Sequence, residues 1–217
     1  MKSFCVIGLS KFGTALALTL AGEGKQVAVI DPDAERVRTV ADTVTHAVIG
    51  DPTNDSVLRS AAVKEYDCVV VAFSDNINDN ILLTIMLKEI GVKYIVVRAL
   101  NEGHRKVLER IGADKIVFPE RDTGERLAIT LGRDNVTDYM EFNGFSLAEI
   151  IVPERWLGKN LMQLEIRKKY AVNVIAVTFP NGKVDVSPSP TRNFEKGERI
   201  TVVGSDAAIA KCMKTID

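Results

Sequence analysis

Short runs rich in valine and isoleucine alternate with longer amphipathic segments through residues 3–118, and this alternation limits the possible folds more than any other feature of the chain. The runs predict strands at 3–8, 26–31, 46–51, 67–73, 94–99 and 115–118, and the segments between them predict helices at 11–23, 33–43, 55–62, 78–90 and 102–111. Strands buried on both faces give continuous apolar runs, and helical crossovers join strands that run parallel. The sequence therefore predicts an α/β fold with a Rossmann-type, doubly wound parallel sheet.

The pattern changes after residue 118. The stretch "PERDTGERLAITLGRD" predicts a helix over 119–134. Proline is common at the first position of a helix, and acidic residues in the first turn interact favourably with the helix dipole. After it, the sequence predicts strands at 147–153, 172–179 and 199–204, helices near 161–169 and from Asp206, and a hairpin turned at Asn181–Gly182. We expect a nucleotide-binding domain with a linking helix over 1–134 and a small α+β domain over 135–217.

Composition and charge narrow the class of protein. The hydrophobic fraction of 46% and the charged fraction of 26% are typical of a soluble globular protein. We see no secretion signal and no run near the ~18 apolar residues of a membrane span. Cys5, Cys68 and Cys212 lie far apart, which predicts free thiols in a reducing cytosol. A net charge of -1 without a basic face argues against a nucleic-acid partner.

The stretch "VIGLSKFG" resembles the phosphate loop that follows the first strand of a dinucleotide-binding sheet. Gly8 permits the tight turn and Gly13 permits close helix packing, but Ser10 stands where a middle glycine lets phosphate approach the backbone. Asp31 ends the second predicted strand, where a carboxylate binds ribose hydroxyls and repels a 2′-phosphate. These residues favour an NAD-like or adenosine ligand over NADP; the structural alternative is a sheet that binds nothing.

Two further positions bear on the choice of ligand. Lys11 follows the turn and reaches a terminal phosphate as a point charge, which suits ADP or ATP; the alternative is an exposed first-turn lysine. Asp51 and Thr53, in "GDPTN", follow the third strand at the edge where ligands bind. They either contact adenine or cap the next helix.

An enzyme is the competing class. A dehydrogenase needs an acid or base beside its nicotinamide, yet neither His46 nor His104 has an obvious carboxylate partner. Cys68 has no visible base, and no His/Cys cluster shows zinc spacing. We expect a protein that is not an enzyme, and keep an NAD(H)-binding redox sensor or NAD-dependent oxidoreductase as the alternative. A nucleotide-sensing transcription regulator is disfavoured because a basic face is missing.

Several stretches in order resemble the regulatory domain of Ktr/Trk-type potassium transporters, known as the RCK or KTN domain. They are "VIGLSKFG", "AVID", "HAVIGDPTNDSVL", "VVVAFSDNINDNILLTIMLKEIGV" and "HRKVLERIGADKIVFPERDTGERLA". The stretch "EIRKKYAVNVIAV" is similar to the RCK C-terminal domain, so the resemblance covers the whole chain. It implies a cytosolic gating subunit that assembles from dimers into an octameric ring beneath a membrane-embedded potassium-translocating partner, with ATP and ADP competing for one site.

The resemblance also assigns residues. It implies that the phosphate loop is formed by Gly8, Ser10, Lys11, Phe12 and Gly13, that Asp31 holds ribose, that Asp51 and Thr53 lie near adenosine, and that Arg98 lies near the phosphates. Glu120 matches a glutamate of a divalent-cation site for magnesium or calcium between subunits; a helix-dipole role is its alternative. This chain departs from the family where Ser10 replaces glycine and Lys11 replaces arginine.

Some members of the family bind cyclic di-AMP between paired C-terminal domains. The matching positions here are Ile166, Arg167, Asn173 and Pro188. Lys168 breaks the pattern, because a small residue usually follows the arginine. The alternative is an ordinary helix and turn at a dimer surface.

Overall fold

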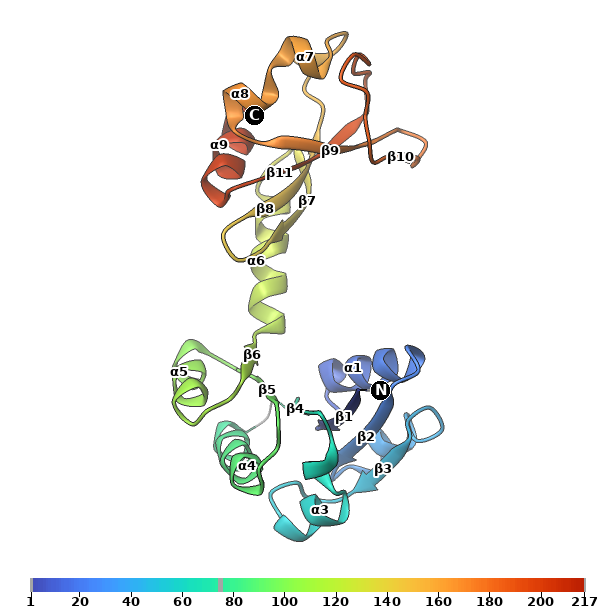
Figure 1. The fold of residues 1–217 in the computed structure, drawn as a ribbon, viewed down its shortest axis with the longest axis vertical. Coiled ribbons are helices and arrows are strands. Elements are labelled where there is room, and N and C mark those ends of the chain that lie inside the picture. Colours follow the sequence, from blue (N-terminus) through green and yellow to red (C-terminus); the bar gives the residue numbers. More distant parts are fainter. Residues whose placement is uncertain (1, 74–75, 217) are drawn as a thin grey trace. The chain divides into compact units, whose positions relative to one another are not determined.

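The computed structural model describes residues 2–73 and 76–216, and contacts divide the chain into two compact units (Figure 1). The first unit is Met1–Pro119 and the second is Glu120–Asp217. Each unit has its own sheet and its own buried core. The two units are therefore described separately.

The first unit contains the predicted parallel sheet. Its strand order is β3-β2-β1-β4-β5-β6, and every pairing is parallel. The strands are β1 (Ser3–Ile7), β2 (Gln26–Asp31), β3 (His46–Ile49), β4 (Cys68–Val71), β5 (Ile95–Arg98) and β6 (Lys115–Val117). Because chain order reverses between β1 and β4, the carboxyl ends of these strands flank the place where doubly wound folds bind ligands.

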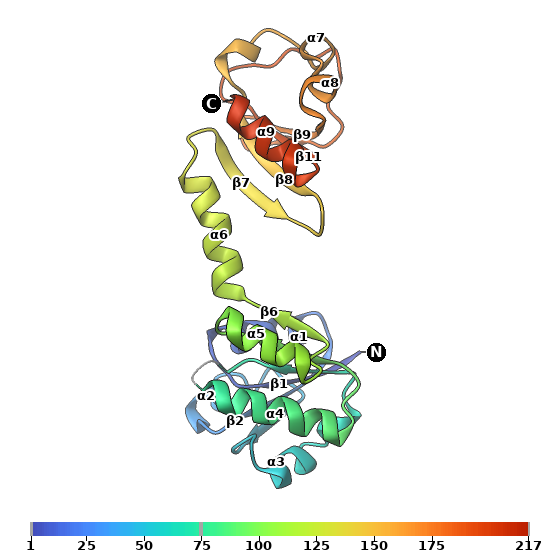
Figure 2. The ribbon, with the colours of Figure 1, turned by 90° about the vertical axis from the view of Figure 1, so that its left-hand side faces the viewer.

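Helices cover both faces of this sheet. On one face, α1 (Lys11–Gly22) and α2 (Ala34–Arg38) enclose a core that includes Val6, Val29 and Val70. On the other face, α3 (Asp55–Ser60), the short 3-10 helix η1 (Val63–Glu65), α4 (Ile77–Ile90) and α5 (Glu102–Arg110) pack over a larger core. Figure 2 shows α4 and α5 side by side across that face. These two apolar layers fix the strand ends, and with them the loops that carry the candidate site.

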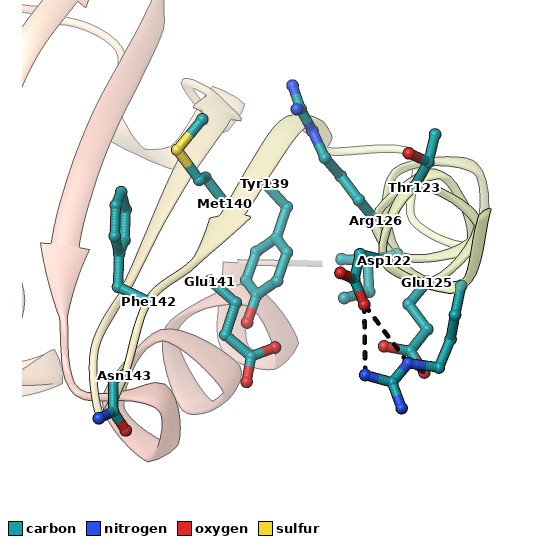
Figure 3. Close-up of a pocket in the computed structure, with 11 residues that line it drawn as sticks. Asp122, Thr123, Glu125, Arg126, Tyr139, Met140, Glu141, Phe142 and Asn143 are labelled. Carbon is teal, nitrogen blue, oxygen red and sulfur yellow. Dashed lines mark hydrogen bonds and ion pairs between the residues drawn. The ribbon is translucent and has the colours of Figure 1, made fainter. Parts of the chain in front are cut away.

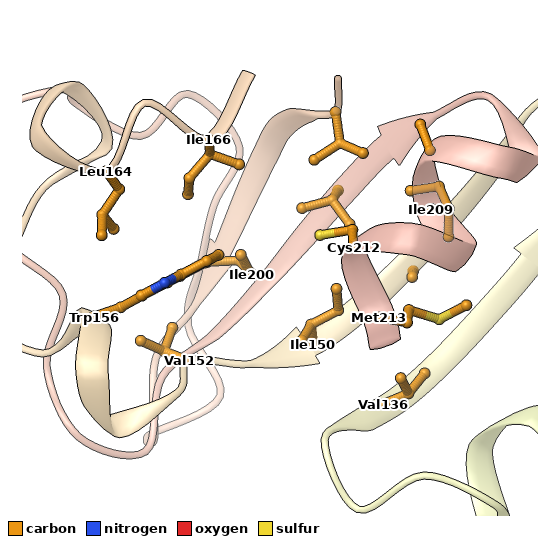
Figure 4. Packing of buried hydrophobic residues seen from close by; sticks show 14 of the residues in the cluster. Val136, Ile150, Val152, Trp156, Leu164, Ile166, Ile200, Ile209, Cys212 and Met213 are labelled. Carbon is orange, nitrogen blue, oxygen red and sulfur yellow. The ribbon is translucent and has the colours of Figure 1, made fainter. Parts of the chain in front are cut away.

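The second unit contains a five-stranded antiparallel sheet in the order β10-β9-β11-β8-β7. Its strands are β7 (Val136–Glu141), β8 (Ser146–Ile151), β9 (Asn173–Thr178), β10 (Val184–Asp185) and β11 (Arg199–Gly204). Its helices are α6 (Pro119–Leu131), the 3-10 helix η2 (Glu154–Trp156), α7 (Leu161–Leu164), α8 (Ile166–Tyr170) and α9 (Asp206–Ile216). Figure 4 shows Ile209, Cys212 and Met213 of α9 lying over Ile150 and Ile200 in the core.

The fold class is confirmed, but several elements differ from the sequence prediction. β7 was not predicted, because its buried residues Val136 and Tyr139 are three apart and a register shift interrupts the pairing with β8. The helix predicted over 33–43 ends at Arg38. The helix predicted near 161–169 is two short helices, because Glu165 adopts a left-handed conformation with φ 48°.

Helix α6 belongs to different parts of the chain in the predicted domain division and in the structure. The sequence placed this helix in the first domain, with a boundary after residue 134, whereas contacts divide the chain after Pro119. Ile129 packs against the core of the second unit, and the Arg126 guanidinium lies 2.8 Å from the carboxylate of Asp138 on β7. These contacts attach α6 to the second sheet.

Candidate nucleotide-binding site

Two glycines shape the turn between β1 and α1. Gly8 has a φ of +95°, and a Cβ there would lie 2.6 Å from the backbone nitrogen of Phe73. A Cβ on Gly13 would lie 2.0 Å from the carbonyl oxygen of Gly8. Left-handed backbone at one position and contact between helix and loop at the other both require glycine. The structure thus gives both residues the roles that the sequence indicated for the turn and the helix packing.

Ser10 caps α1 and does not present its hydroxyl to the open edge of the sheet. Its Oγ donates a hydrogen bond to the carbonyl oxygen of Ala72 at 2.7 Å and accepts one from the amide of Gly13 at 3.3 Å. Its φ of -61° is accessible to any residue, so the turn itself does not need glycine there. The proton of the Ser10 hydroxyl is donated to Ala72.

Asp31 connects the same loop to the end of β2. One carboxylate oxygen accepts the amide of Leu9 at 2.6 Å, and the other accepts the amide of Asp33 at 2.8 Å. The residue is 2% exposed, so these two hydrogen bonds hold a buried carboxylate in place. A carboxylate offers about four acceptor positions, and two of them are used here.

Lys11 and Phe12 form the first turn of α1. Lys11 is exposed, and the ring of Phe12 packs against the core beneath α1. The backbone amides of the first helical turn have no acceptor within the helix. One of them, the amide of Gly13, donates its hydrogen bond to the Oγ of Ser10. Within the part of the chain that the structure describes, the amides of Lys11 and Phe12 have no acceptor, so they remain as hydrogen-bond donors at the positive end of the helix dipole.

Asp51 and Thr53 form a turn after β3. The Asp51 Oδ1 accepts the amide of Thr53 at 2.8 Å and its hydroxyl at 2.6 Å. These two hydrogen bonds, led by that from the hydroxyl, lower the pKa of the Asp51 carboxyl. Neither residue caps α3, because Asn54 does so by accepting the amide of Ser56. The capping alternative is therefore wrong, and both side chains stand at the predicted edge.

Asn80 was not selected from the sequence, although it lies at the same edge. This fully buried residue of α4 donates to the carbonyl oxygens of Phe73, at 3.4 Å, and Arg98, at 3.2 Å. Arg98 ends β5 and is 8% exposed. Asn80 shares the buried face of α4 with Leu83, Thr84 and Leu87, so a polar residue at core spacing was the available signal.

The two histidines and the three cysteines differ in their burial. His104 is buried, its Nδ1 accepts the amide of Leu100 at 3.3 Å, and burial lowers the pKa of its imidazole. His46 is exposed on β3. All three cysteines are free. Burial raises the pKa of the Cys5 thiol to about 12 and those of Cys68 and Cys212 to about 11, so these thiols are poor nucleophiles near neutral pH.

The remaining predicted residues belong to the second unit. Glu120 is exposed in the first turn of α6, and the described residues contain no cluster of three or more His, Cys, Asp or Glu side chains able to hold a metal ion. Arg167 and Asn173 are exposed and Pro188 is half-buried. Ile166 is 3% exposed and belongs to the core, so its side chain packs inside the domain (Figure 4).

An open cleft of about 520 Å³ lies between α6 and the β7 hairpin (Figure 3). Arg121, Asp122, Glu125 and Arg126 line one side of it, and Tyr139 to Asn143 line the other. Arg121 pairs with Asp122 and Glu125, and Arg126 pairs with Asp138. These pairings within the chain leave the cleft with mixed charge.

Comparison with known proteins identifies relatives of both units. The TrkA-N domain model matches residues 4–119, and the TrkA-C domain model matches residues 147–217. The chain is 42% identical to the Ktr system potassium uptake protein C of Bacillus subtilis (strain 168), over 99% of this chain and 97% of that protein. It is 34% identical to the Ktr system potassium uptake protein A of the same organism, over 94% and 91% of the two chains.

Solved structures share the fold at lower sequence identity. The GsuK channel superposes with a TM-score of 0.69 and 18% identity, over 96% of this chain. This chain spans 38% of the channel's length. In the described residues, no helix combines the length and the apolar character needed to span a membrane. Two matching domain models in order, with full-length identity of 42%, show that the chain belongs to the TrkA-N/TrkA-C family of potassium uptake proteins.

Proposed function

We propose that this protein is the nucleotide-binding regulatory subunit of a potassium uptake system, and that exchange of ATP and ADP shifts the conformation of a homo-oligomeric ring. The observation that carries the proposal is the convergence of the Gly8–Gly13 turn with Asp31 at the reversal of strand order beside β1. A helix N-terminus and an acidic residue at this place form a site for an adenine nucleotide.

Each part of the nucleotide has a matching group in this chain. The amides of Lys11 and Phe12 donate hydrogen bonds to the phosphates, and the ammonium of Lys11 adds a point charge for the last phosphate. The two remaining acceptor positions of Asp31 take ribose hydroxyls. Asp51 and Thr53 flank the adenosine, and Arg98 supplies positive charge at the end of β5.

Gating then depends on differential binding. A nucleotide shifts a ring between two shapes only if it binds one shape more tightly than the other. Lys11 provides that difference through the γ-phosphate, and Glu120 provides it through a bound magnesium or calcium ion. Lysine does not bind phosphate bidentately as arginine does, so the contribution of Lys11 to discrimination between ATP and ADP comes from its charge alone.

Assembly and location follow from the same proposal. The subunit acts in the cytoplasm, at the inner face of the membrane, through a membrane-embedded potassium-translocating partner. Exposed apolar side chains on α4 and α5, namely Leu82, Ile85 and Val107, support self-association through these helices. Dimers assemble into an octameric ring, and no nucleic acid takes part.

A second candidate is an NAD(H)-binding redox sensor. It is favoured by the carboxylate of Asp31, which suits a ribose without a 2′-phosphate in NAD as well as in ADP. A GsuK channel structure bound to NAD shares the fold, with a TM-score of 0.68 and 18% identity.

We propose a second ligand for the C-terminal domain. Cyclic di-AMP binds between two copies at Arg167, Asn173 and Pro188, where the exposed guanidinium contacts phosphate. Because Ile166 is buried in the core, it contributes by supporting α8 from beneath.

Calorimetric titration with ATP, ADP, NADH and cyclic di-AMP, each with and without magnesium or calcium, tests these proposals. Tight binding of ATP and ADP with weak NADH binding is the expected result, and the reverse order favours the redox sensor. Lys11→Ala should weaken ATP binding about tenfold and ADP binding less, because a charge-assisted contact is lost. Lys115→Ala, at the amino end of β6, is the matched control and should change neither affinity. An unchanged ATP/ADP ratio in Lys11→Ala contradicts the role of that residue.

A further inference from the structure

Ser10 joins the β1–α1 turn to the segment that follows β4. Its Oγ lies 2.7 Å from the carbonyl oxygen of Ala72, a residue 62 positions later in the chain, and 3.3 Å from the amide of Gly13. The amide of Ala72 also donates to the carbonyl oxygen of Ile7 at 2.8 Å. Backbone and side chain therefore hold the two loops together from both sides.

The same chain of contacts reaches the end of β5. Phe73 follows Ala72 and lies against Gly8, whose missing Cβ leaves the room for that approach. The Asn80 amide group donates to Phe73 at 3.4 Å and to Arg98 at 3.2 Å, in a fully buried position. Two sets of hydrogen bonds, joined by the peptide link between Ala72 and Phe73, thus connect the first turn of α1 to the last residue of β5.

A serine hydroxyl has one proton to donate, and here the proton is donated to Ala72. A phosphate would have to break this bond to receive it. The loop donors that stay available are backbone amides, whose directions depend on how the loop is held.

We propose that Ser10 is a positioning residue for the nucleotide site: it fixes the turn before α1 onto the segment after β4, so that the amides of Lys11 and Phe12 are aligned before the ligand arrives. The proposal rests on the proposed function, because it concerns the same nucleotide site. A ligand binds a pre-aligned loop more tightly, since affinity falls in proportion to the fraction of binding-competent protein.

The test compares Ser10→Ala and Ser10→Thr with the wild-type protein. ADP affinity is measured by calorimetry, and amide hydrogen exchange is measured without nucleotide. Ser10→Ala should weaken ADP binding about tenfold and speed exchange at the Gly13 amide, in line with the loss of a cap plus a loop contact. Ser10→Thr keeps the hydroxyl and should restore both.

Ser205→Ala is the matched control. Ser205 precedes α9, and its Oγ accepts a hydrogen bond from the amide of Ala208 at 3.3 Å. This bond matches the one between the Gly13 amide and Ser10 in type and distance, but it lies in the second unit. Its loss should lower the melting temperature without changing ADP affinity. If Ser10→Ala behaves in the same way, Ser10 is only a helix cap and the proposal is wrong. If its ADP affinity falls while exchange in the nucleotide-free protein is unchanged, Ser10 contacts the ligand directly and the proposal is also wrong.

Asn80→Leu tests the extension to β5. Because both residues hold the segment at Ala72 and Phe73, Ser10→Ala combined with Asn80→Leu should weaken ADP binding less than the sum of the single effects. If the losses in ADP binding of the two single variants add up in the double variant, Ser10 and Asn80 contribute to binding independently. A wild-type protein that binds no ADP overturns the proposed function itself, whereas wild-type binding with unaffected Ser10 variants overturns only this inference.

Discussion

At Gly13 a single hydrogen atom occupies the space between α1 and the turn that precedes it. Gly13→Ala places a methyl group 2.0 Å from the carbonyl oxygen of Gly8, so either the helix or the loop must move. We expect a loss of about 3 kcal/mol in the free energy of unfolding, at the upper end of overpacking effects. Urea unfolding measures it. Gly22→Ala, in the last turn of the same helix with open space around it, should be neutral or stabilising by up to about 1 kcal/mol. Equal effects at both positions would contradict the packing role.

The roles of Gly8 and Gly13 could be predicted because they follow from the local spacing of a strand, a turn and a helix. The bonds of Ser10 could not, since the acceptor Ala72 comes 62 positions later and becomes a neighbour only when β1 pairs with β4. The burial of Ile166 could not be predicted from the sequence either, because it depends on packing between α8 and the rest of the second core.

At the scale of elements, two strands were predicted with their observed bounds, although β2 is buried along most of its length and β11 alternates between buried and half-buried residues. β2 and β11 have the predicted bounds, 26–31 and 199–204. Periodicity did not reveal β7, because its two buried residues are three apart and its pairing with β8 shifts register. It also did not reveal the interruption at Glu165, because a left-handed residue without glycine has no local signature.

The end of α8 offers a prediction about such left-handed residues. Ala171 follows the helix with φ 58°, and its amide donates to the carbonyl oxygen of Arg167. Ala171→Gly removes the steric cost of a Cβ in this conformation and should stabilise the protein by about 1 kcal/mol. Ala15→Gly makes the same chemical change at an exposed position inside α1 and should destabilise by a similar amount. Thermal melts of the two variants should therefore shift in opposite directions, and a shift in the same direction would refute the assignment.

At the scale of the whole molecule, the two units have separate cores, and the single tryptophan of the chain reports on one of them. Trp156 is 3% exposed in the core of the second unit, together with Val152 and Leu164 (Figure 4). The proposed nucleotide loop belongs to the first unit. Tryptophan fluorescence therefore follows unfolding of the unit that does not hold the loop, while circular dichroism follows both.

A ligand stabilises only the cooperative unit that binds it. ADP at 100 times its dissociation constant adds about 2.7 kcal/mol to the free energy of unfolding of that unit. For a domain of this size that energy raises the melting temperature by about 10 °C. We expect ADP to raise a transition seen by circular dichroism and to leave the fluorescence transition of Trp156 in place. If ADP raises both transitions equally, the two cores unfold as one cooperative unit, and coupling of that kind is what a nucleotide signal needs to pass from the first unit to the second.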